Sequence, residues 1–538
     1  MQKVRVPITN FQFGEISDST IMRTDSPVYQ ASAQRVENLL VRAEGGVVKR
    51  AGLRNIHDFG ITRDTTKRMQ LRLMPFVFSD DERYIIAIED AKVKCFRIVN
   101  GSITLVATLT QDTNSNALPF DEEYLHEYTH AQSGDVMFVC HPLFAPRMII
   151  RTGLTSFECT PYSFDERSDG KEIYQPYSVF HPPSATLDPS ATSGTGVTFT
   201  TSIPYFTADH VGVTMRYGEA EFTITSVTSS TVAVGNITDI LRIRLSVLNP
   251  LRTIDSSTTI EVTHINHGFE GGETIIVEDA SAVGGINANQ INGTRTISSI
   301  IDRNSYRITA GHSANLSEDG GGLVKIQTHA PTHNWDEQSF SAVRGYPAAI
   351  EFHENRLCFG GTIQEPDAIW MSKIGEFFNF DVGDAEDSDS INLVAATGDV
   401  NEIRYLVSNR DLQVFTASAE LYVPTFLNQA ITPANAQIRK QTPYGCEFVE
   451  PQSIDGATIF MQTGGRVVRE YLYTDSEDAY TSTAVSMISS HLINDLQDLA
   501  VVNGAFEKAE SYAVFVSSSG YCAVFGSNRA ERRAGWMR

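Results

Sequence analysis

The feature of this chain that most restricts its fold is an alternation of apolar and polar residues with a period of two, in many short runs. Clear examples are Arg83–Ile88, Lys92–Ile98, Ala457–Gln462 and Tyr512–Val516. The runs are bounded by Gly, Asp, Asn and Ser, which favour tight turns. Because successive side chains of a strand point to opposite faces, this pattern predicts many short antiparallel strands and a mainly β fold.

Helical patterns are few. Ser26 and Pro27 precede apolar residues spaced near 3.6 from Val28 to Leu40, which predicts a capped helix. A second helix is predicted over residues 483–496, where the apolar side chains fall on one side. Two helices are too few for a bundle, so sheets must supply the core.

The 538 residues exceed the size of one hydrophobic core, so we expect several domains. Thr, Ser, Ile and Val dominate between about 183 and 333, after a proline-containing linker. We therefore predict three parts: residues 1–182, one or two inserted β-domains at 183–333, and residues 334–538. Both outer parts show the same pattern of strand, tight turn and strand, which favours a single β-propeller-like core built from the two parts together.

The net charge of −23 argues against a protein that grips nucleic acid over much of its surface, because DNA affinity rests on Lys and Arg neutralising phosphates. An acidic wall still allows DNA to pass close by without adsorbing. The first residues lack the apolar core of a signal peptide, and no run has the length of a membrane span. We expect a protein made in a cytoplasm, with no membrane insertion.

The six cysteines lie far apart with no C-x-x-C pair, which does not support a zinc ribbon or a disulfide framework. We expect all six to be small buried hydrophobic residues: Cys95, Cys140, Cys159, Cys358, Cys446 and Cys522.

Three stretches carry glycines, aromatic residues and charges in a distinctive order. The first is Phe13-Gly14-Glu15-Ile16-Ser17, then Arg23, Asp25, Tyr29, Glu37-Asn38, Gly45-Gly46, Arg50 and Gly52. The second and most specific is Arg344–Ala349, Phe352–Leu357, Phe359–Thr362, Ile369–Lys373 and Gly375–Phe380. The third is Gln132–Val136 with His141, Pro142, Pro146 and Arg151. All three resemble tail proteins of short-tailed bacteriophages (podoviruses), the family called nozzle, tail tubular protein B or packaged-DNA stabilisation protein.

This resemblance implies a structural virion protein and no enzyme, with no catalytic residue, metal ligand or cofactor. It implies a homo-oligomeric ring, a hexamer by family resemblance, in the virion tail after synthesis in the host bacterial cytoplasm. The implied partners are the adaptor and portal-complex ring, tail fibres or tip, and genomic DNA. The DNA would pass through the lumen without specific binding, retained until infection and then ejected.

Two local resemblances refine this expectation. Phrases inside the insertion, such as Asn292-Gly293-Thr294 and Tyr306-Arg307-Ile308, resemble a small β-barrel module of phage tail proteins, as do His267-Gly268-Phe269, Gly271-Gly272-Glu273 and Ile276. In relatives the chain usually continues past a residue like Trp536 into another strand, so we expect the last blade to lack a closing element.

A literal H-E-x-x-H stands at His126-Glu127-Tyr128-Thr129-His130, the pattern in which two histidines one helical turn apart bind zinc. A turn and a β-run follow at once, and no third ligand motif extends it. We therefore expect histidines on the surface beside strands, and keep a zinc hydrolase as a rival hypothesis.

Two acidic groups were weighed as sites. The first has the oxygen-rich composition that suits calcium but not the EF-hand spacing, so we expect a solvated or channel-facing loop: Asp381, Asp384, Glu386, Asp387 and Asp389. The second invites a glycosidase interpretation, although acids in loops are commonplace: Glu470, Asp475, Glu477 and Asp478. A receptor-binding or glycan-degrading tail protein is accordingly the main rival function, although three Trp residues supply few sugar-stacking surfaces.

The remaining expectations are structural. Gly345, Gly360 and Gly361 should form tight turns, beside a core strand with Phe352, Leu357 and Phe359. Arg356 should be a buried partner of an acid such as Glu354 or Asp367. Arginines at the end of the chain are expected to face an acidic neighbour: Arg529, Arg532, Arg533 and Arg538.

Overall fold

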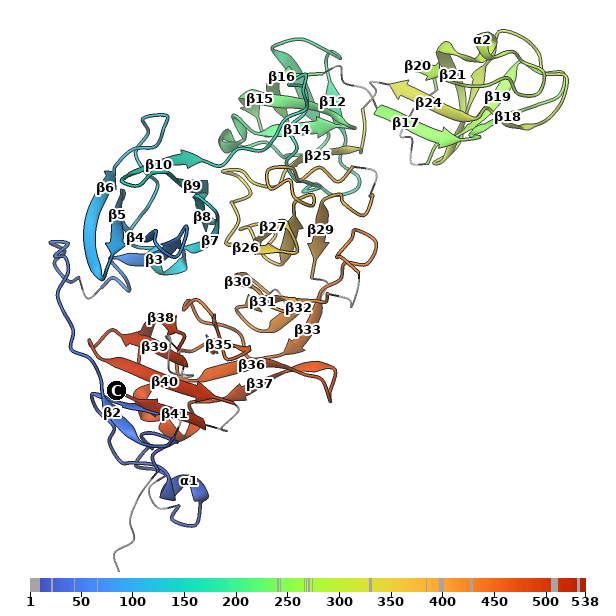
Figure 1. The fold of residues 1–538 in the computed structure, drawn as a ribbon. Helices are drawn as coiled ribbons and strands as arrows, with labels where there is room; N and C mark the ends of the chain where they lie inside the picture. The colour runs from blue at the N-terminus through green and yellow to red at the C-terminus, as the bar shows by residue number, and fades with distance from the viewer. Residues whose placement is uncertain are drawn as a thin grey trace, which may run out of the picture. The chain divides into compact units, whose positions relative to one another are not determined.

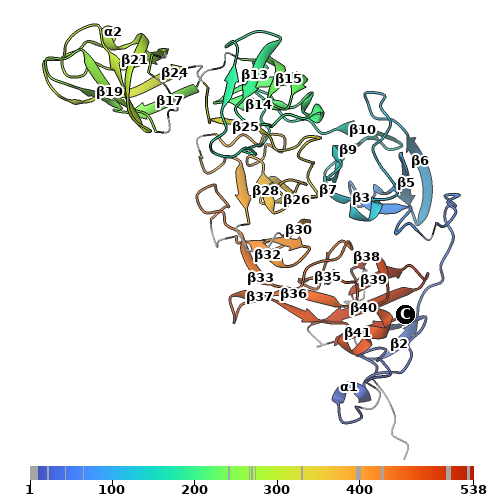
Figure 2. The same cartoon turned by 180° about the vertical axis from the view of Figure 1, so that it is seen from behind.

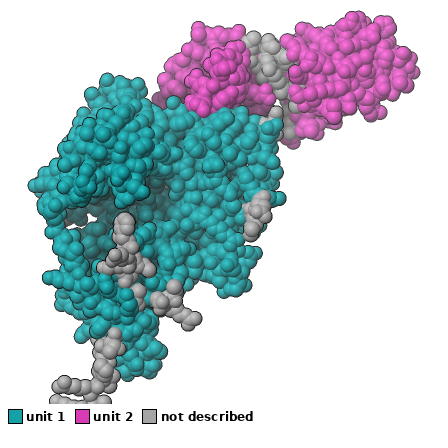
Figure 3. Space-filling model, in the orientation of Figure 1, with its two compact units in different colours: residues 1–163, 344–538 teal, residues 164–343 magenta. Residues whose placement is uncertain are grey.

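The computed structural model describes residues 10–20, 23–42, 44–64, 66–239, 241, 243–265, 267, 269, 271–272, 274–328, 331–383, 385–395, 401–425, 429–504, 511–529 and 533–538. The chain forms two compact units, which Figure 3 shows in different colours. Unit 1 comprises Met1–Ser163 and Arg344–Arg538, and unit 2 comprises Phe164–Val343.

Unit 1 is a six-bladed β-propeller, which confirms the predicted mainly β, propeller-like core built from N- and C-terminal parts (Figures 1 and 2). Each blade is a four-stranded antiparallel sheet of consecutive strands. Blade 1 is β3 (Arg72–Val77), β4 (Arg83–Glu89), β5 (Lys92–Val99) and β6 (Ser102–Leu109); blade 2 is β7 (Thr129–Ser133), β8 (Val136–His141), β9 (Phe144–Gly153) and β10 (Ser156–Pro161). Blade 3 is β26 (Ala349–His353), β27 (Arg356–Gly360), β28 (Ala368–Met371) and β29 (Ile391–Val394); blade 4 is β30 (Ile403–Ser408), β31 (Leu412–Thr416), β32 (Glu420–Val423) and β33 (Arg439–Thr442). Blade 5 is β34 (Gln452–Ile454), β35 (Ala457–Met461), β36 (Val468–Thr474) and β37 (Ala479–Ala484); blade 6 is β38 (Leu496–Val502), β39 (Ser511–Ser517), β40 (Cys522–Asn528) and β41 (Arg533–Met537).

The four runs with the clearest alternation are the strands β4, β5, β35 and β39. β41 is the fourth strand of blade 6, so the expectation that the last blade lacks an element was wrong: this blade has four strands like the other five. The first strand of each blade lies nearest the centre of the propeller (Figure 1).

Tight turns shape the most specific motif as expected. Gly345 and Gly361 have φ of +85° and +62°, and a Cβ on Gly345 would lie 2.7 Å from Cγ1 of Ile363. Gly360 lies inside β27 and has no positive φ, so its expected turn role was wrong. Between β26 and β27, Glu354 and Asn355 both have positive φ, the geometry of a two-residue hairpin turn.

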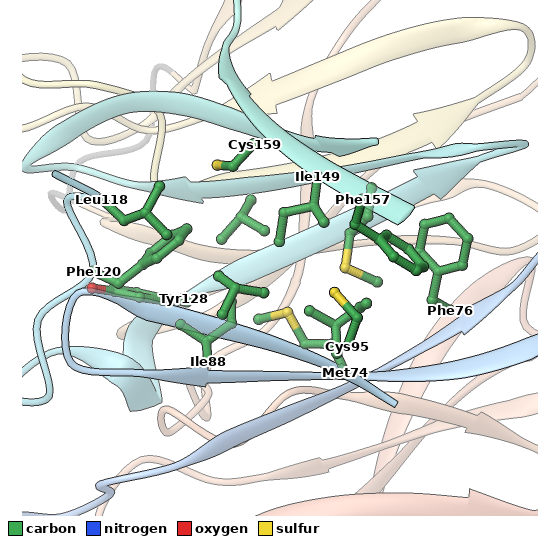
Figure 4. Packing of buried hydrophobic residues seen from close by; sticks show 14 of the residues in the cluster. Met74, Phe76, Ile88, Cys95, Leu118, Phe120, Tyr128, Ile149, Phe157 and Cys159 are labelled. Atoms are coloured by element: carbon green, nitrogen blue, oxygen red, sulfur yellow. The ribbon is translucent and has the colours of Figure 1, made fainter. Parts of the chain in front are cut away.

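Hydrophobic side chains join most neighbouring blades. Blades 1 and 2 share one buried cluster, with Met74 on β3 and Phe157 on β10 (Figure 4). Blades 2 and 3 meet through aromatic rings, such as those of Phe138 and Phe352, whose centroids lie 5.7 Å apart. Further buried clusters are shared by blades 3 and 4, blades 4 and 5, and blades 5 and 6.

The residues before blade 1 form an N-terminal arm, residues 10–50, that packs on blade 6. It contains α1 (Pro27–Gln30), β1 (Leu39–Val41) and β2 (Val47–Lys49), and β1 lies beside β41. Ser26 caps α1 with Pro27 at its start as predicted, but the helix ends at Gln30 and does not reach residue 40. The reason is tertiary: Ala33 pairs in parallel with Glu15, which requires an extended backbone.

The second predicted helix was also wrong in extent. Residues 479–484 form β37, Met487–Leu492 form a short 3-10 helix, and β38 begins at Leu496. The apolar residues of this stretch fill the core between blades 5 and 6, where Leu492, Ile493 and Leu496 are buried.

Unit 2 contains two sheets. The seven-stranded sheet is formed by β11 (Tyr177–Ser178), β12 (Leu187–Pro189), β13 (Val197–Thr201), β14 (Thr214–Tyr217), β15 (Ala220–Ser229), β16 (Val232–Ile237) and β25 (Trp335–Gln338), with a 3-10 helix at Ala208–His210. Two of its strands, β11 and β25, lie outside the predicted insertion at residues 183–333, one before it and one after it.

The second sheet of unit 2 is eight-stranded, nearly closed and barrel-like, which confirms the predicted β-barrel insertion. Its strands are β17 (Ile243–Leu248), β18 (Leu251–Thr253), β19 (Thr259–Thr263), β20 (Thr274–Glu278), β21 (Gly293–Asp302), β22 (Ser305–Thr309), β23 (Asp319–Gly320) and β24 (Leu323–Thr328), with α2 at Ala288–Ile291. Gly293 has a φ of +99° at the start of β21, and Tyr306 is fully buried in the barrel core. Gly268 and Glu273 lie outside the described residues.

Five cysteines are buried as expected, but Cys522 is exposed at the start of β40, so that part of the prediction was wrong. All six are free thiols. In the part of the chain that the structure describes, no helix has the length and apolar character of a membrane span.

Candidate functional site

Charged and phenolic side chains from five of the blades, and from segments that lead into blades 1, 2 and 5, gather at the centre of the propeller. We call this set the axial cluster. On strands lie Arg72 of blade 1, His130 of blade 2, Glu351 of blade 3, Arg404 and Tyr405 of blade 4, and Asp498 of blade 6. In the segments before the blades lie Arg68 (blade 1), His126 and Glu127 (blade 2), and Glu447 and Glu450 (blade 5). First strands meet at the centre of a propeller, so residues distant in sequence become neighbours there.

The central contact is an ion pair between blades 1 and 5. Nη2 of Arg72 donates to Oε2 of Glu450 at 2.6 Å, and Arg72 is 2% exposed. Nδ1 of His130 lies 3.5 Å from the same carboxylate oxygen, an ion-pair distance without hydrogen-bond geometry. This pair therefore brings the first, second and fifth blades together.

A second set of contacts lies around Phe448. Arg68 donates to the Phe448 carbonyl at 3.1 Å and pairs with Glu447 at 3.3 Å. Arg404 donates to the Cys446 carbonyl at 2.8 Å, and its guanidinium lies over the Phe448 ring, 4.1 Å from the centroid. Two arginines from different blades thus hold the entry to blade 5.

The axial carboxyls differ widely in pKa. Burial opposes the charge of Glu450, but His130 and Arg72 outweigh it and lower its pKa to about 2. Burial raises the pKa of Glu351 to about 7 and also raises the pKa of Asp498. Burial lowers the pKa of His126 to about 4. Despite burial, hydrogen bonds and nearby positive charges also lower the pKa values of Glu127 and Glu447, so three axial carboxyls have lowered and two have raised pKa values.

The H-E-x-x-H residues belong to this cluster without forming a zinc motif. Residues 125–127 are a 3-10 turn and His130 lies on strand β7, so the two histidines are not on one helical face. Glu127 contacts His126 at 3.4 Å and His141 at 3.2 Å, whereas His130 faces Glu450. The expected surface position was wrong, because both histidines are largely buried. Among the described residues, no group of three or more His, Cys, Asp or Glu side chains is arranged to hold a metal ion.

Two clefts border the axial cluster. One of about 560 Å³ lies between residues 55–73 and blade 6, with Arg68, Leu73, Gln497 and Asp498 in its wall. The other, of about 370 Å³, shares Arg68 and reaches Glu447 and Asp495. Neither of these two clefts is lined by Glu351 or Glu450.

The predicted acidic loop forms ion pairs with the side chain of Lys373. Lys373 lies 3.5 Å from Asp381 and 3.2 Å from Asp389, and Asp389 is buried. Glu386 and Asp387 are exposed, as a solvated loop requires, but the ion pairs make the expectation wrong for Asp381 and Asp389. Asp384 lies outside the described residues.

The second acidic group is dispersed. Glu470 pairs with Arg529, Asp475 pairs with Arg410 at 3.4 Å, and Asp478 accepts a hydrogen bond from Tyr473. Glu477 is exposed in the same turn. The structure does not bring these four carboxyls to one pocket.

Arg356 is buried as predicted, but its partners are backbone groups. Its guanidinium donates to the carbonyls of Ser372 and Asp389 at 2.6 Å each, to Asp387 at 3.0 Å and to Ile431 at 3.2 Å. The predicted acid partner was therefore wrong. In the same motif Leu357 and Phe359 are fully buried, whereas Phe352 is half-buried.

The arginines near the C-terminus are engaged within the chain. Arg529 pairs with Glu470, Arg533 donates to the Val41 carbonyl at 2.6 Å, and Arg538 pairs with Glu15 at 3.1 Å. Whether Arg529 and Arg538, each about one third exposed, also face an acidic neighbour stays a prediction. Arg532 lies outside the described residues.

Comparisons with known proteins give no family. No protein-family model and no curated protein matches this chain. Among solved structures, it is similar to a phage phi92 endosialidase at 9% identity (77% of this chain, 56% of that chain, TM-score 0.18). It is also similar to an ancestral GH74 enzyme at 9% identity (85% and 57%, TM-score 0.25) and to a puromycin hydrolase at 10% (76% and 52%, TM-score 0.23). The chain spans about half the length of these structures, and at such TM-scores they carry no argument about activity.

Proposed function

We propose that this chain is a nozzle, or tail-tube, subunit of a short-tailed bacteriophage, a structural virion protein that forms a ring around DNA leaving the capsid. The observation that carries the proposal is the resemblance of the three sequence stretches, which follow the family order from residue 13 to residue 380. A mainly β propeller with an inserted barrel is the architecture which that resemblance implies.

The structural roles of the motif residues support a scaffold. In the first stretch, a Cβ on Gly14 would lie 2.1 Å from the Trp536 carbonyl oxygen, and Glu15 is fully buried. In the third stretch, the Gln132 side chain accepts from Val77 N at 3.0 Å and donates to Val77 O at 2.8 Å, which joins blades 1 and 2. These residues preserve shape, the property on which an assembled conduit depends.

The conduit in this proposal is the space enclosed by several copies of the chain. The axis of one propeller is crossed by the Arg72–Glu450 pair, so it is no passage for a duplex. A ring forms when a head-to-tail contact repeats with a rotation that closes. With a net charge of −23 on each copy, a polyanion would slide past the wall without adhering.

Fluorescence anisotropy with a labelled duplex DNA tests this mode of action. We expect no saturable binding at nanomolar protein in low salt, where any phosphate-directed affinity is strongest. Nanomolar affinity that falls steeply with added salt would contradict the sliding conduit.

The glycan-degrading rival is favoured by one observation, the separated pKa values of Glu351 and Glu450. A carboxyl with a raised pKa beside one with a lowered pKa is the arrangement that supplies the acid and the base of glycoside hydrolysis. Release of reducing sugar from bacterial surface polysaccharide, abolished by Glu351→Gln, would establish this rival. We expect no release, because neither described cleft exposes this pair.

A further inference from the structure

The seam between blade 1 and blade 6 differs from the other five seams of the propeller. Those five are filled by shared apolar clusters or aromatic contacts. None of the buried clusters described above combines residues of blades 1 and 6. The cleft of about 560 Å³ separates blade 6 from residues 55–73, of which Leu73 belongs to blade 1. Figure 3 shows the surface of unit 1 hollowed at this place. The ring is therefore closed here without the hydrophobic packing that joins its other blades.

No strand is exchanged across this seam either. Each blade consists of four consecutive strands, so the first and last blades of the chain share no sheet. The N-terminal arm is bound on the blade 6 side of the seam: Asn38 N donates to the Arg538 carbonyl at 2.7 Å, and Ser17 N donates to the Ile488 carbonyl at 2.8 Å in the 3-10 helix before blade 6. Arg50 is held to the arm by its Nε, which donates to Asn38 Oδ1 at 2.8 Å.

The chain crosses from one side of the seam to the other within residues 51–53. Arg50 is fixed on the blade 6 side, and Arg54 already donates to the Gly101 carbonyl of blade 1 at 3.0 Å. Leu53 is 91% exposed, and nothing lies within 4 Å of the place where a Cβ on Gly52 would be. The Ala51 carbonyl accepts from Nη1 of its neighbour Arg50 at 2.8 Å, and residues 51–53 are all exposed. Such an exposed segment with a glycine has the properties of a hinge.

At the axis, two arginines close the ring. Arg72 pairs with Glu450, and Arg68 pairs with Glu447, so both ties run from the start of blade 1 to the entry of blade 5. The groups facing these ties are His126, Glu127 and His130 of blade 2, Glu351 of blade 3, Arg404 and Tyr405 of blade 4, and Asp498 of blade 6.

This closure is incomplete in hydrogen bonding. Nη1 of Arg72, Nε of Arg68 and Oη of Tyr405 are buried and have no hydrogen-bond partner among the described residues. Buried polar atoms without partners cost free energy, and desolvation offsets much of the attraction in a buried ion pair. The seam is thus held by groups whose net contribution is small compared with that of an apolar interface.

We propose that the propeller opens at the seam between blades 1 and 6, with the Arg68 and Arg72 ion pairs as a latch and residues 51–53 as a hinge. Small rotations shared among the other five seams let blades 1 and 6 move apart, while the apolar contacts of those five seams keep them closed. This inference does not depend on the proposed function.

Pulsed electron–electron spin resonance measures the opening directly. Cys522, the exposed native cysteine, places one nitroxide on blade 6, and Asp81→Cys in the exposed β3–β4 turn places the other on blade 1. In the Arg68→Met/Arg72→Met background, we expect the distance distribution to shift to longer values and to broaden. Arg83→Met, a surface arginine of blade 1 that is 53% exposed, is the matched control and should leave the distribution unchanged.

A label pair across a packed seam is the internal control. Glu477→Cys on blade 5 with Cys522 on blade 6 should keep its distance in every variant, because these blades share a buried cluster. If the 81–522 distance stays unchanged when the arginines are replaced, or both label pairs shift together, the latch is refuted.

Should the double variant fail to fold, the labelled Asp81→Cys protein with both arginines intact gives the same answer. Guanidinium chloride screens ion pairs, so at sub-denaturing concentrations the 81–522 distance should lengthen before the far-ultraviolet circular dichroism changes. Simultaneous change of both signals would contradict a separate opening of this seam.

Discussion

Replacing Arg356 by Met should destabilise unit 1 more than any surface change, because this guanidinium is 1% exposed and donates to four backbone carbonyls. Hydrogen bonds to a charged group contribute about 1.5–3 kcal/mol each, and the methionine leaves all four acceptors without this donor. Local rearrangement will give some of these carbonyls new hydrogen-bond donors. We therefore expect a loss of about 3–5 kcal/mol, similar to breaking a buried ion pair.

Urea unfolding followed by circular dichroism, and calorimetry on the full chain, measure this loss. Arg356→Lys keeps the charge but not the planar fork, so its loss should be intermediate. Arg83→Met, at an exposed ion pair with Asp80, should change the free energy of unfolding by less than about 0.5 kcal/mol. A loss below about 1 kcal/mol for Arg356→Met would refute the carbonyl-clamp role of this arginine.

Three further predictions follow from particular residues. Gly14→Ala should make the N-terminal arm sensitive to limited proteolysis, because Gly14 has a φ of +68° and an added Cβ would collide with the Trp536 backbone. Gly134→Ala is the control: Gly134 has a φ of +56° but open space around it, so this change should lower the free energy of unfolding in urea by only about 1 kcal/mol. Burial raises the pKa of Glu351 from 4.5 to about 7, so the stability that its neutral form contributes is full below about pH 4.5 and is lost by about pH 7. The free energy of unfolding should therefore fall between about pH 4.5 and pH 7 and level off above, and Glu351→Gln should flatten that dependence. Zinc in the protein purified without chelators, measured by mass spectrometry, should be far below one equivalent, since His126 and His130 do not face one another; one tightly held equivalent would contradict this.

Much of the fold follows from local patterns. Strands such as β4 and β39 are rich in β-branched and aromatic residues, and buried positions recur every second residue along β39 and in the first half of β4. The helix expected over residues 26–40 failed because long-range pairing determines its second half. Ala33 bonds with residues near Gly14, and Leu39 pairs in β1, contacts that no local spacing reveals.

The axial cluster was not visible in the sequence for a similar reason. Glu351 lies 279 residues after Arg72 and 99 residues before Glu450, and the arrangement of the blades makes them neighbours. The one signal was the isolated H-E-x-x-H, whose His130 does lie at the axis. Arg356 shows the converse limit: its burial was predictable, but its carbonyl partners carry no side-chain signal.

The most direct test of the proposed ring is the mass and shape of the full chain in solution. Light scattering combined with negative-stain imaging, alone and with the adaptor ring, should show a closed oligomer with an open axial channel. A monomer that persists in both samples at all concentrations would contradict the conduit.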